Sequence, residues 1–232
     1  MPVPLPVLSR LLKQGALILG VATLTLLAWR AYDSERGPAL QPWHLKVPHE
    51  LSVEQLDHAD WSAWLQAEDR VFTEVRQQVS ERLDPGQVPP FNRYRQDSRA
   101  YPPRFATNWN RSYLLRPAGT PRGVVVLLHG LTDSPYSLRH VAQRYVEHGY
   151  LAIGLRLPGH GTVPAGLTDA QWQDWLAATR LALRAARAEV PAPAPLHLVG
   201  YSNGAALAVK YTLDALSAVS YTHLRAHETR ED

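Results

Sequence analysis

The chain of 232 residues contains no cysteine. This excludes disulfide bridges, thiolate metal sites and a cysteine nucleophile, although it does not assign a cellular compartment. Charge is also sparse, because charged residues make up 19% of the sequence and the net charge is +3. No basic block therefore favours nucleic acid as a partner. The sequence also lacks a P-loop, a zinc-ligand spacing, a dinucleotide-binding G-x-G-x-x-G and internal repeats. It predicts neither a cofactor nor a metal ion.

The one long hydrophobic run lies near the N-terminus. Its uncharged part, Gln14–Trp29, is shorter than the roughly 20 residues that a membrane span usually needs. Lys13 and the two leucines before it lengthen the run if the lysine amine extends to the interface. Arg10 and Lys13 favour an N-terminus on the cytoplasmic side. No A-x-A cleavage site follows, so we expect residues 1–32 to be an uncleaved membrane anchor, with the rest on the periplasmic or exterior side. A cleaved signal peptide, which would give a secreted protein, and a buried core helix are the alternatives.

Residues 33–107 predict a linker followed by a helical extension. Prolines and a glycine interrupt Asp33–Pro48, which indicates a linker. Ser52 and the glutamine three residues later have the spacing of a capping box. Apolar residues at helical spacing then predict a helix over Asp60–Leu83, with a tryptophan pair on its packing face. Val88–Phe105 is rich in proline, arginine and tyrosine, and we expect irregular chain there.

From residue 108 onward, apolar runs alternate with amphipathic segments. The pattern predicts strands at Ser112–Arg116, Gly123–Leu128, Tyr150–Leu155 and Leu196–Gly200, and helices at Pro135–Gly149 and Asp169–Glu189. Ser134 followed by proline has the character of an N-cap. Strands that are apolar throughout are buried on both faces. The sequence therefore predicts a doubly wound, mostly parallel α/β sheet over residues 108–218.

Three short motifs follow three of these strands. They are His129-Gly130-Leu131, Pro158-Gly159-His160-Gly161 and Gly200-Tyr201-Ser202-Asn203-Gly204. The last is G-x-S-x-G, in which a serine rides a sharp turn between strand and helix and exposes its hydroxyl. The glycines are needed because the turn leaves no room for side chains. The bare pattern also matches a glycine-rich turn of another doubly wound fold.

In this order, the three motifs resemble those of the α/β-hydrolase superfamily. The chain is most similar to the carboxylesterase, monoacylglycerol-lipase and serine-aminopeptidase-like branch, and the resemblance covers Asn108–Leu216. It implies that Ser202 is the nucleophile and forms an acyl-enzyme. It also implies an oxyanion hole made by the backbone N–H groups of Leu131 and Asn203.

The resemblance gives the remaining motif residues supporting roles. His129, Gly130, Gly200 and Gly204 are expected to shape the turns, while His160 and Tyr201 are candidates to border the substrate pocket. His129 is an alternative proton acceptor, but the fold carries its triad in the order serine, acid, histidine. His197 lies within a predicted strand and is expected to be a structural residue.

The triad acid and histidine are expected to be absent from this chain. Both should follow later strands, and too few residues follow Ser202 to form them. No strand is predicted before His223, His227 or Asp232. Residues 219–232 abandon the apolar period and resemble the translation of a common transposon-end sequencing adapter. We therefore expect an inactive fragment whose natural sequence ends near residue 218, followed by a non-native tail.

The resulting hypothesis is a serine hydrolase that acts on carboxylic esters of small molecules or lipids and is tethered to a membrane. An acyltransferase or an aminopeptidase on the same fold is one alternative. A non-catalytic binding module with the α/β-hydrolase fold is the other. Nucleic acid is not an expected partner. The sequence leaves the identity of the ester and the oligomeric state open.

Overall fold

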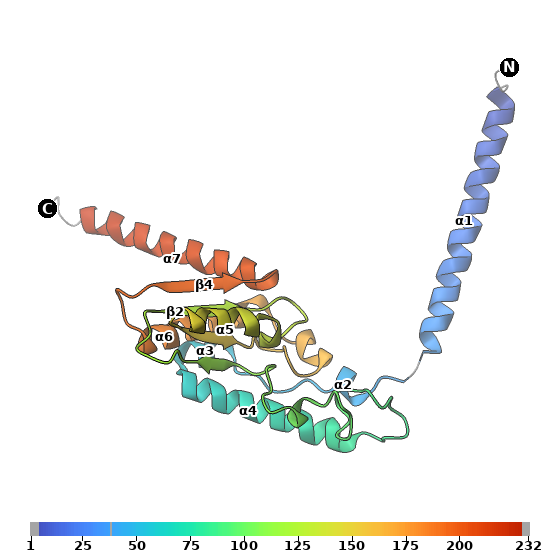
Figure 1. Cartoon of the computed structure of the whole chain (residues 1–232). Helices are drawn as coiled ribbons and strands as arrows, with labels where there is room; N and C mark the ends of the chain where they lie inside the picture. The colour runs from blue at the N-terminus through green and yellow to red at the C-terminus, as the bar shows by residue number, and fades with distance from the viewer. Residues whose placement is uncertain (1–4, 38, 229–232) are drawn as a thin grey trace. The chain divides into compact units, whose positions relative to one another are not determined.

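The computed structural model describes residues 5–37 and 39–228. The chain divides into two compact units, Met1–Leu40 and Gln41–Asp232. The first unit is the helix α1, Leu5–Glu35 (Figure 1). It is longer than the expected run, because no helix-breaking residue occurs between Arg30 and Gly37. The start of the expected linker, as far as Glu35, is therefore helical.

The apolar part of α1 is long enough to cross a membrane. An 18-residue window within its segment Ser9–Glu35 has a mean hydropathy of 1.7, and none of this window is buried. A signal sequence has the same length and composition, so both the anchor and the signal sequence agree with this helix.

The second unit begins with two short helices. Helix α2, Pro42–Leu45, was expected to be linker. It forms because proline is tolerated at the first helical position, where its missing N–H costs no hydrogen bond. Helix α3, Val53–His58, is capped at its N-terminus by Ser52. The Ser52 Oγ accepts the Gln55 N–H at 3.2 Å, and the Gln55 Oε1 accepts the Ser52 N–H at 2.9 Å. This confirms the predicted capping box.

Helix α4, Trp61–Gln78, ends earlier than predicted. Asp60 caps it by accepting the Ala63 N–H at 2.7 Å. Its last expected turn tightens into the 3-10 helix Ser80–Arg82, a common ending for an α-helix. Trp64 is completely buried in the core, as expected for the packing face.

The sheet has four strands in the order β1-β3-β2-β4. Their bounds are β1 Tyr113–Leu115, β2 Gly123–Leu128, β3 Tyr150–Leu155 and β4 Leu196–Gly200. Strand β1 pairs antiparallel with β3, whereas β2 pairs parallel with both β3 and β4. The predicted mostly parallel α/β sheet is confirmed. Strand β4, which leads to Ser202, is an edge strand among the described residues.

Helices cover both faces of this sheet (Figure 1). Successive side chains of a strand point to opposite faces. Val124, Val126 and Leu128 pack in one core with helices α6, Trp172–Glu189, and α7, Asn203–Glu228. Val125 and Leu127 pack on the other face with α5, Arg139–Glu147. This arrangement places the ends of β2, β3 and β4 at one edge of the sheet.

Two helices begin later than the sequence indicated. The segment Pro135–Leu138 is a 3-10 helix, and only then does α5 begin. Ser134 does not cap it with its side chain, because the Ser134 Oγ donates to Asn110 Oδ1 at 2.9 Å. Helix α6 begins at Trp172, because a separate 3-10 helix, Pro164–Thr168, precedes it.

The helical extension packs directly on the sheet layer. Leu56 of α3 and Trp64 of α4 belong to the same core as β2, β3 and α6. Val88–Phe105 contains turns and one 3-10 helix, Pro102–Arg104, in line with the expected irregular chain. Tyr94 of this segment is buried with Val163 and donates its hydroxyl to the Thr162 carbonyl at 3.1 Å. The extension therefore borders the loop that follows β3.

Candidate active site

Ser202 occupies a sharp turn between β4 and α7. Its φ angle is +52°, in the left-handed region that few residues other than glycine adopt. The Tyr201 N–H donates to the Leu128 carbonyl at 3.0 Å, which ties the turn to the end of β2. The Ser202 carbonyl accepts the Ala205 N–H at 2.9 Å as α7 begins. The turn thus raises an exposed serine at the start of a helix.

The two outer glycines of the turn allow this close packing. A Cβ on Gly200 would collide with the Gly204 backbone. A Cβ on Gly204 would collide with the Leu128 and His129 carbonyl groups. Because any larger residue would push α7 away from β2, these positions require glycine.

The loop after β2 lies beside the serine. A Cβ built on Gly130 would lie 3.2 Å from the Tyr201 ring and 3.4 Å from the Ser202 Cβ. Leu131 follows directly and is 53% exposed. Thr132 has a φ angle of +59°, so this loop also contains a non-glycine residue in the left-handed region. Such outliers gather at functional sites.

Two backbone N–H groups near Ser202 are available to a ligand. Neither the Leu131 nor the Asn203 N–H donates a hydrogen bond to another residue of the described chain. Asn203 is the first residue of α7, where the helix dipole favours negative charge. The structure therefore places a serine hydroxyl and two free donors in one neighbourhood.

No acid or base is hydrogen-bonded to the serine among the residues whose side chains the structure describes. The Ser202 hydroxyl makes no hydrogen bond to a described histidine or carboxylate. His223 and His227 lie in the last turns of α7, where side-chain positions are not described, and Asp232 lies outside the described residues. The described site thus contains a serine and N–H donors without a proton acceptor.

His129 is held by the backbone on both sides of its ring. Its Nε2 accepts the Leu157 N–H at 3.1 Å, so its Nδ1 carries the proton and donates to the Gly130 carbonyl at 2.9 Å. The ring is completely buried, and this burial lowers the pKa of His129 to about 3. A neutral imidazole with both nitrogens engaged is not available to take a proton from Ser202.

His160 lines a cavity of about 510 Å³ next to the loop after β2. Thr132, Asp133 and Ser134 line the same cavity, whereas Tyr201 and Ser202 do not. The His160 Nδ1 donates to the Pro158 carbonyl at 3.0 Å, and burial lowers the pKa of this histidine. His160 therefore lines a cavity that does not include the serine turn, and its expected place beside the substrate pocket stays a prediction.

Tyr201 was expected to border the substrate pocket, and His197 was expected to be a structural residue. Tyr201 is 62% exposed beside Gly130, so its ring is open to a ligand above the turn. The His197 Nδ1 lies 3.3 Å from the Tyr145 hydroxyl, and its ring packs against Tyr150. His197 therefore has a partner within the sheet layer, away from Ser202.

Comparison with known proteins finds sequence similarities for the part of the chain that contains Ser202. Residues 119–222 match the family model described as serine aminopeptidase, S33. A thermostable monoacylglycerol lipase of Bacillus sp. (strain H-257) is 40% identical over 53 residues, which are 23% of this chain and 21% of that relative. A solved structure from a study of LipS and LipT, two metagenome-derived lipolytic enzymes, is 33% identical. Its TM-score is 0.38, and the match covers 43% of this chain and 38% of that chain.

Residues 119–222 are therefore similar to α/β-hydrolases. The matches support the esterase and lipase branch of that superfamily. The chain covers only about a fifth of the length of the curated relative. Residues 41–107 lie outside the matched segment, so their contribution to the site has to be found in the structure.

Residues 41–107 contribute partners to Arg156, which lies directly after β3 within residues 119–222, here called the hydrolase segment. The Arg156 side chain is fully buried. Its Nη1 and Nη2 donate to the two oxygens of Glu50 at 2.6 and 2.9 Å, and its Nε donates to Glu68 Oε1 at 3.0 Å. Burial by itself lowers the pKa of Arg156, but the two carboxylates outweigh it, so the pKa is raised. We call Arg156, Glu50 and Glu68 the buried clamp.

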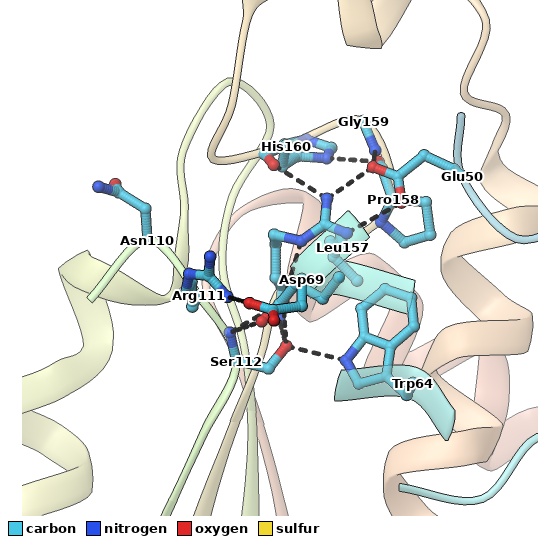
Figure 2. A network of polar contacts seen from close by, with 12 residues as sticks. Glu50, Trp64, Asp69, Asn110, Arg111, Ser112, Leu157, Pro158, Gly159 and His160 are labelled. Carbon is cyan, nitrogen blue, oxygen red and sulfur yellow. Dashed lines mark hydrogen bonds and ion pairs between the residues drawn. The ribbon is translucent and has the colours of Figure 1, made fainter. Parts of the chain in front are cut away.

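The buried clamp holds the loop that carries His160. Figure 2 shows Glu50 and His160 at one end of the network and Ser112 and Trp64 at the other. Glu50 Oε1 also accepts the Gly159 N–H at 2.9 Å, and Arg156 Nη1 donates to the His160 carbonyl at 3.1 Å. Both carboxylates come from the extension, so the extension positions a loop of the hydrolase segment.

At its other end, the buried clamp connects α4 to Ser112, directly before β1. Glu68 accepts the backbone N–H of Ser112 at 3.0 Å and the Ser112 hydroxyl at 2.9 Å. The Ser112 Oγ in turn accepts the Arg156 N–H at 2.9 Å and the Trp64 indole N–H at 3.0 Å.

This network of Arg156 and its partners was not predicted from the sequence. The available signal was one arginine between buried leucines, because a guanidinium there requires a carboxylate partner.

The buried state of His129 generates a prediction about pH. Its pKa is about 3 in the folded chain, against an ordinary value of 6.5. Between these values the unfolded chain binds the additional proton, so the stabilisation is present above pH 6.5 and is lost as the pH falls towards 3. We expect His129→Gln to flatten the dependence of the unfolding free energy on pH in that window, as measured by urea titrations.

The matched control is His140→Gln, because His140 is exposed on α5. It should leave the slope of the wild-type protein unchanged. The pKa of His160 is also lowered by burial, so the His129→Gln variant should keep part of the slope. Identical slopes in wild type and His129→Gln would contradict the assignment of a neutral, buried His129.

Proposed function

We propose that this protein is a serine hydrolase that acts on carboxylic esters, with Ser202 as its nucleophile. The observation that carries this proposal is the φ angle of +52° at Ser202, between Gly200 and Gly204, at the start of α7. A strained backbone at an exposed serine costs about 1–3 kcal/mol and persists where a function uses it. In this turn, the strain lifts the hydroxyl away from the sheet, towards a substrate.

The oxyanion hole is proposed to consist of the Leu131 and Asn203 N–H groups. Both lie beside Ser202, and neither donates to another part of the described chain. A preorganised donor of this kind contributes roughly 3 kcal/mol to the transition state. The role requires only a backbone N–H, so any side chain is acceptable at either position.

In the proposed reaction, the Ser202 Oγ attacks the carbonyl carbon of the ester as a base removes the hydroxyl proton. The carbonyl oxygen becomes an oxyanion between the two N–H donors. The alcohol leaves with a proton, and water then releases the acid from the acyl-enzyme. We assign neither the base nor its acid partner to a described residue, because no described side chain hydrogen-bonds to the Ser202 hydroxyl.

A lipid or small-molecule ester is the proposed substrate. The relative from Bacillus is described as a monoacylglycerol lipase. Leu131 and Tyr201 are 53% and 62% exposed beside the serine, and their apolar surfaces suit an acyl chain. The matched family model is described as a serine aminopeptidase, so an aminopeptidase is the second candidate. Hydrolysis of p-nitrophenyl butyrate and of an aminoacyl p-nitroanilide by the same preparation separates the two.

We propose further that α1 anchors the hydrolase in a membrane. Its segment Ser9–Glu35 is apolar and exposed. Arg10 and Lys13 precede its uncharged part, and these charges favour an N-terminus on the cytoplasmic side. Residues 41–232 would then face the periplasm or the exterior.

The nucleophile is tested on the natural gene product that contains this chain. A fluorophosphonate probe should label it, and Ser202→Ala should abolish the labelling, because the probe reacts only with an activated serine. Ser217→Ala on the same helix is the matched control and should label as wild type does. Equal labelling of wild type and Ser202→Ala would exclude Ser202 as the nucleophile.

The 232-residue chain alone gives a separate result. Because no described side chain engages the Ser202 hydroxyl, we expect it to hydrolyse p-nitrophenyl butyrate no faster than its own Ser202→Ala variant. Faster hydrolysis that is lost in His223→Ala or His227→Ala would place the base in α7 and contradict this expectation.

The anchor is tested by adding protease to spheroplasts of a Gram-negative host that expresses the protein. Residues 41–232 should be digested while a membrane-embedded stub remains, because an anchor oriented by Arg10 and Lys13 exposes them outside the inner membrane. A cytoplasmic marker protein must stay intact in the same sample. Release of the protein by a salt wash, or protection of residues 41–232, would contradict the orientation.

A further inference from the structure

Two arginines that lack carboxylate partners line one cavity away from the serine turn. This cavity of about 600 Å³ lies between residues 100–110 and the start of α5, and it includes Arg93 and Arg139. Across the described part of the chain, neither guanidinium has a carboxylate within 4.0 Å. Other arginines, such as Arg95 and Arg111, do form ion pairs. No acidic residue lines this cavity. It therefore has a net positive lining.

Both guanidinium groups are held in place without being neutralised. Arg139 Nη1 donates to the Tyr136 carbonyl at 2.7 Å, and its guanidinium carbon lies 3.7 Å from the centroid of the Tyr136 ring. Arg93 Nη2 donates to the Gly161 carbonyl at 3.3 Å. An arginine has five N–H donors, so each keeps several for a ligand. Asp133 lines the adjoining His160 cavity, and its Oδ1 accepts the Ser134 N–H at 2.7 Å.

The rest of the lining is mostly apolar and aromatic. Phe105 is 58% exposed and Tyr136 is 49% exposed, and Trp109 and Pro102 complete this side of the cavity. Large exposed aromatic surfaces favour burial against an apolar partner. The ligand that fits such a lining has an apolar body and a negatively charged head.

We propose that this cavity, which we call the arginine groove, binds an amphiphilic carboxylate, with the head at Arg93 and Arg139 and the chain against Phe105 and Trp109. A guanidinium matches a carboxylate with two parallel N–H donors, and stacking on Tyr136 fixes the plane of the Arg139 fork. An apolar chain replaces water over the exposed aromatic rings. A neutral ester or a cationic amphiphile lacks the charge that this lining selects.

The arginine groove adjoins the cavity that contains His160, because Arg93, Asn110 and Tyr136 line both. Binding in the groove does not require Ser202. If the proposed hydrolysis occurs, each turnover consumes one water molecule and transfers one proton to the departing alcohol. The released acid then gives its own proton to the solvent and becomes a carboxylate. The product then has the chemistry that the groove accepts.

The test uses the full chain in nanodiscs of neutral lipid and isothermal titration calorimetry, with empty nanodiscs as the reference. Octanoate should bind, whereas octanol and octyltrimethylammonium should bind at least about tenfold more weakly, because a charge-assisted hydrogen bond is lost. Arg93→Gln and Arg139→Gln should each weaken octanoate about tenfold for the same reason. Arg70→Gln, at an exposed arginine of α4 outside the groove, is the matched control and should change nothing.

Two further variants keep the proposal falsifiable if Arg93→Gln disturbs the loop at Gly161. Arg139→Lys keeps the charge but loses the fork, so octanoate affinity should lie between wild type and Arg139→Gln. Ser202→Ala should bind octanoate as wild type does, which separates this proposal from the proposed nucleophile. Octanol binding as tight as octanoate, an equal loss in Arg70→Gln, or octyl phosphate binding more than about tenfold tighter than octanoate would overturn the proposal.

Discussion

The buried charge of Arg156 is the constraint on which the rest of this structure depends. Moving a guanidinium from water into the interior costs several kcal/mol unless carboxylates and hydrogen bonds surround it. Glu50 and Glu68 supply the carboxylates, and the His160 carbonyl accepts a further guanidinium N–H. The fold therefore has to bring residues 50 and 68 to the end of β3. If the extension detached from the sheet, the charge of Arg156 would be exposed to water or would stay buried without a partner.

The loops at this edge of the sheet are linked to one another as a consequence. The loop after β3 donates the Leu157 N–H to His129 in the loop after β2. The end of β2 accepts the Tyr201 N–H from the turn after β4. Hydrogen bonds of the backbone and of the His129 ring thus connect the loop that Glu50 holds to the neighbourhood of Ser202. The proposed catalytic turn and the His160 cavity share one support.

Local sequence patterns predicted the strands and the serine turn, because both are encoded within a few residues. Strands β2 and β3 coincide with uninterrupted apolar runs, β4 coincides with an apolar run that contains one histidine, and the turn requires glycine at positions 200 and 204. The clamp could not be predicted in this way, since Glu50 and Glu68 lie 106 and 88 residues from Arg156 in the chain. The arginine groove likewise combines Arg93 with Arg139 across two elements. Such long-range pairs become visible only when the chain is folded.

The central claim, that the extension and the hydrolase segment are one unit joined by the buried clamp, is tested most directly by hydrogen exchange of the full chain. Glu68 does not contact the Gly159 N–H, yet Glu68→Gln should accelerate amide exchange in residues 157–161 as well as in α4. Acceleration of roughly 10²-fold or more is expected, because breaking a buried pair costs about 3–5 kcal/mol. Asp57→Asn, which breaks the more exposed ion pair with Arg180, should change neither segment. Faster exchange confined to α4 in Glu68→Gln would show that the extension and the loop are independent, and would contradict the account.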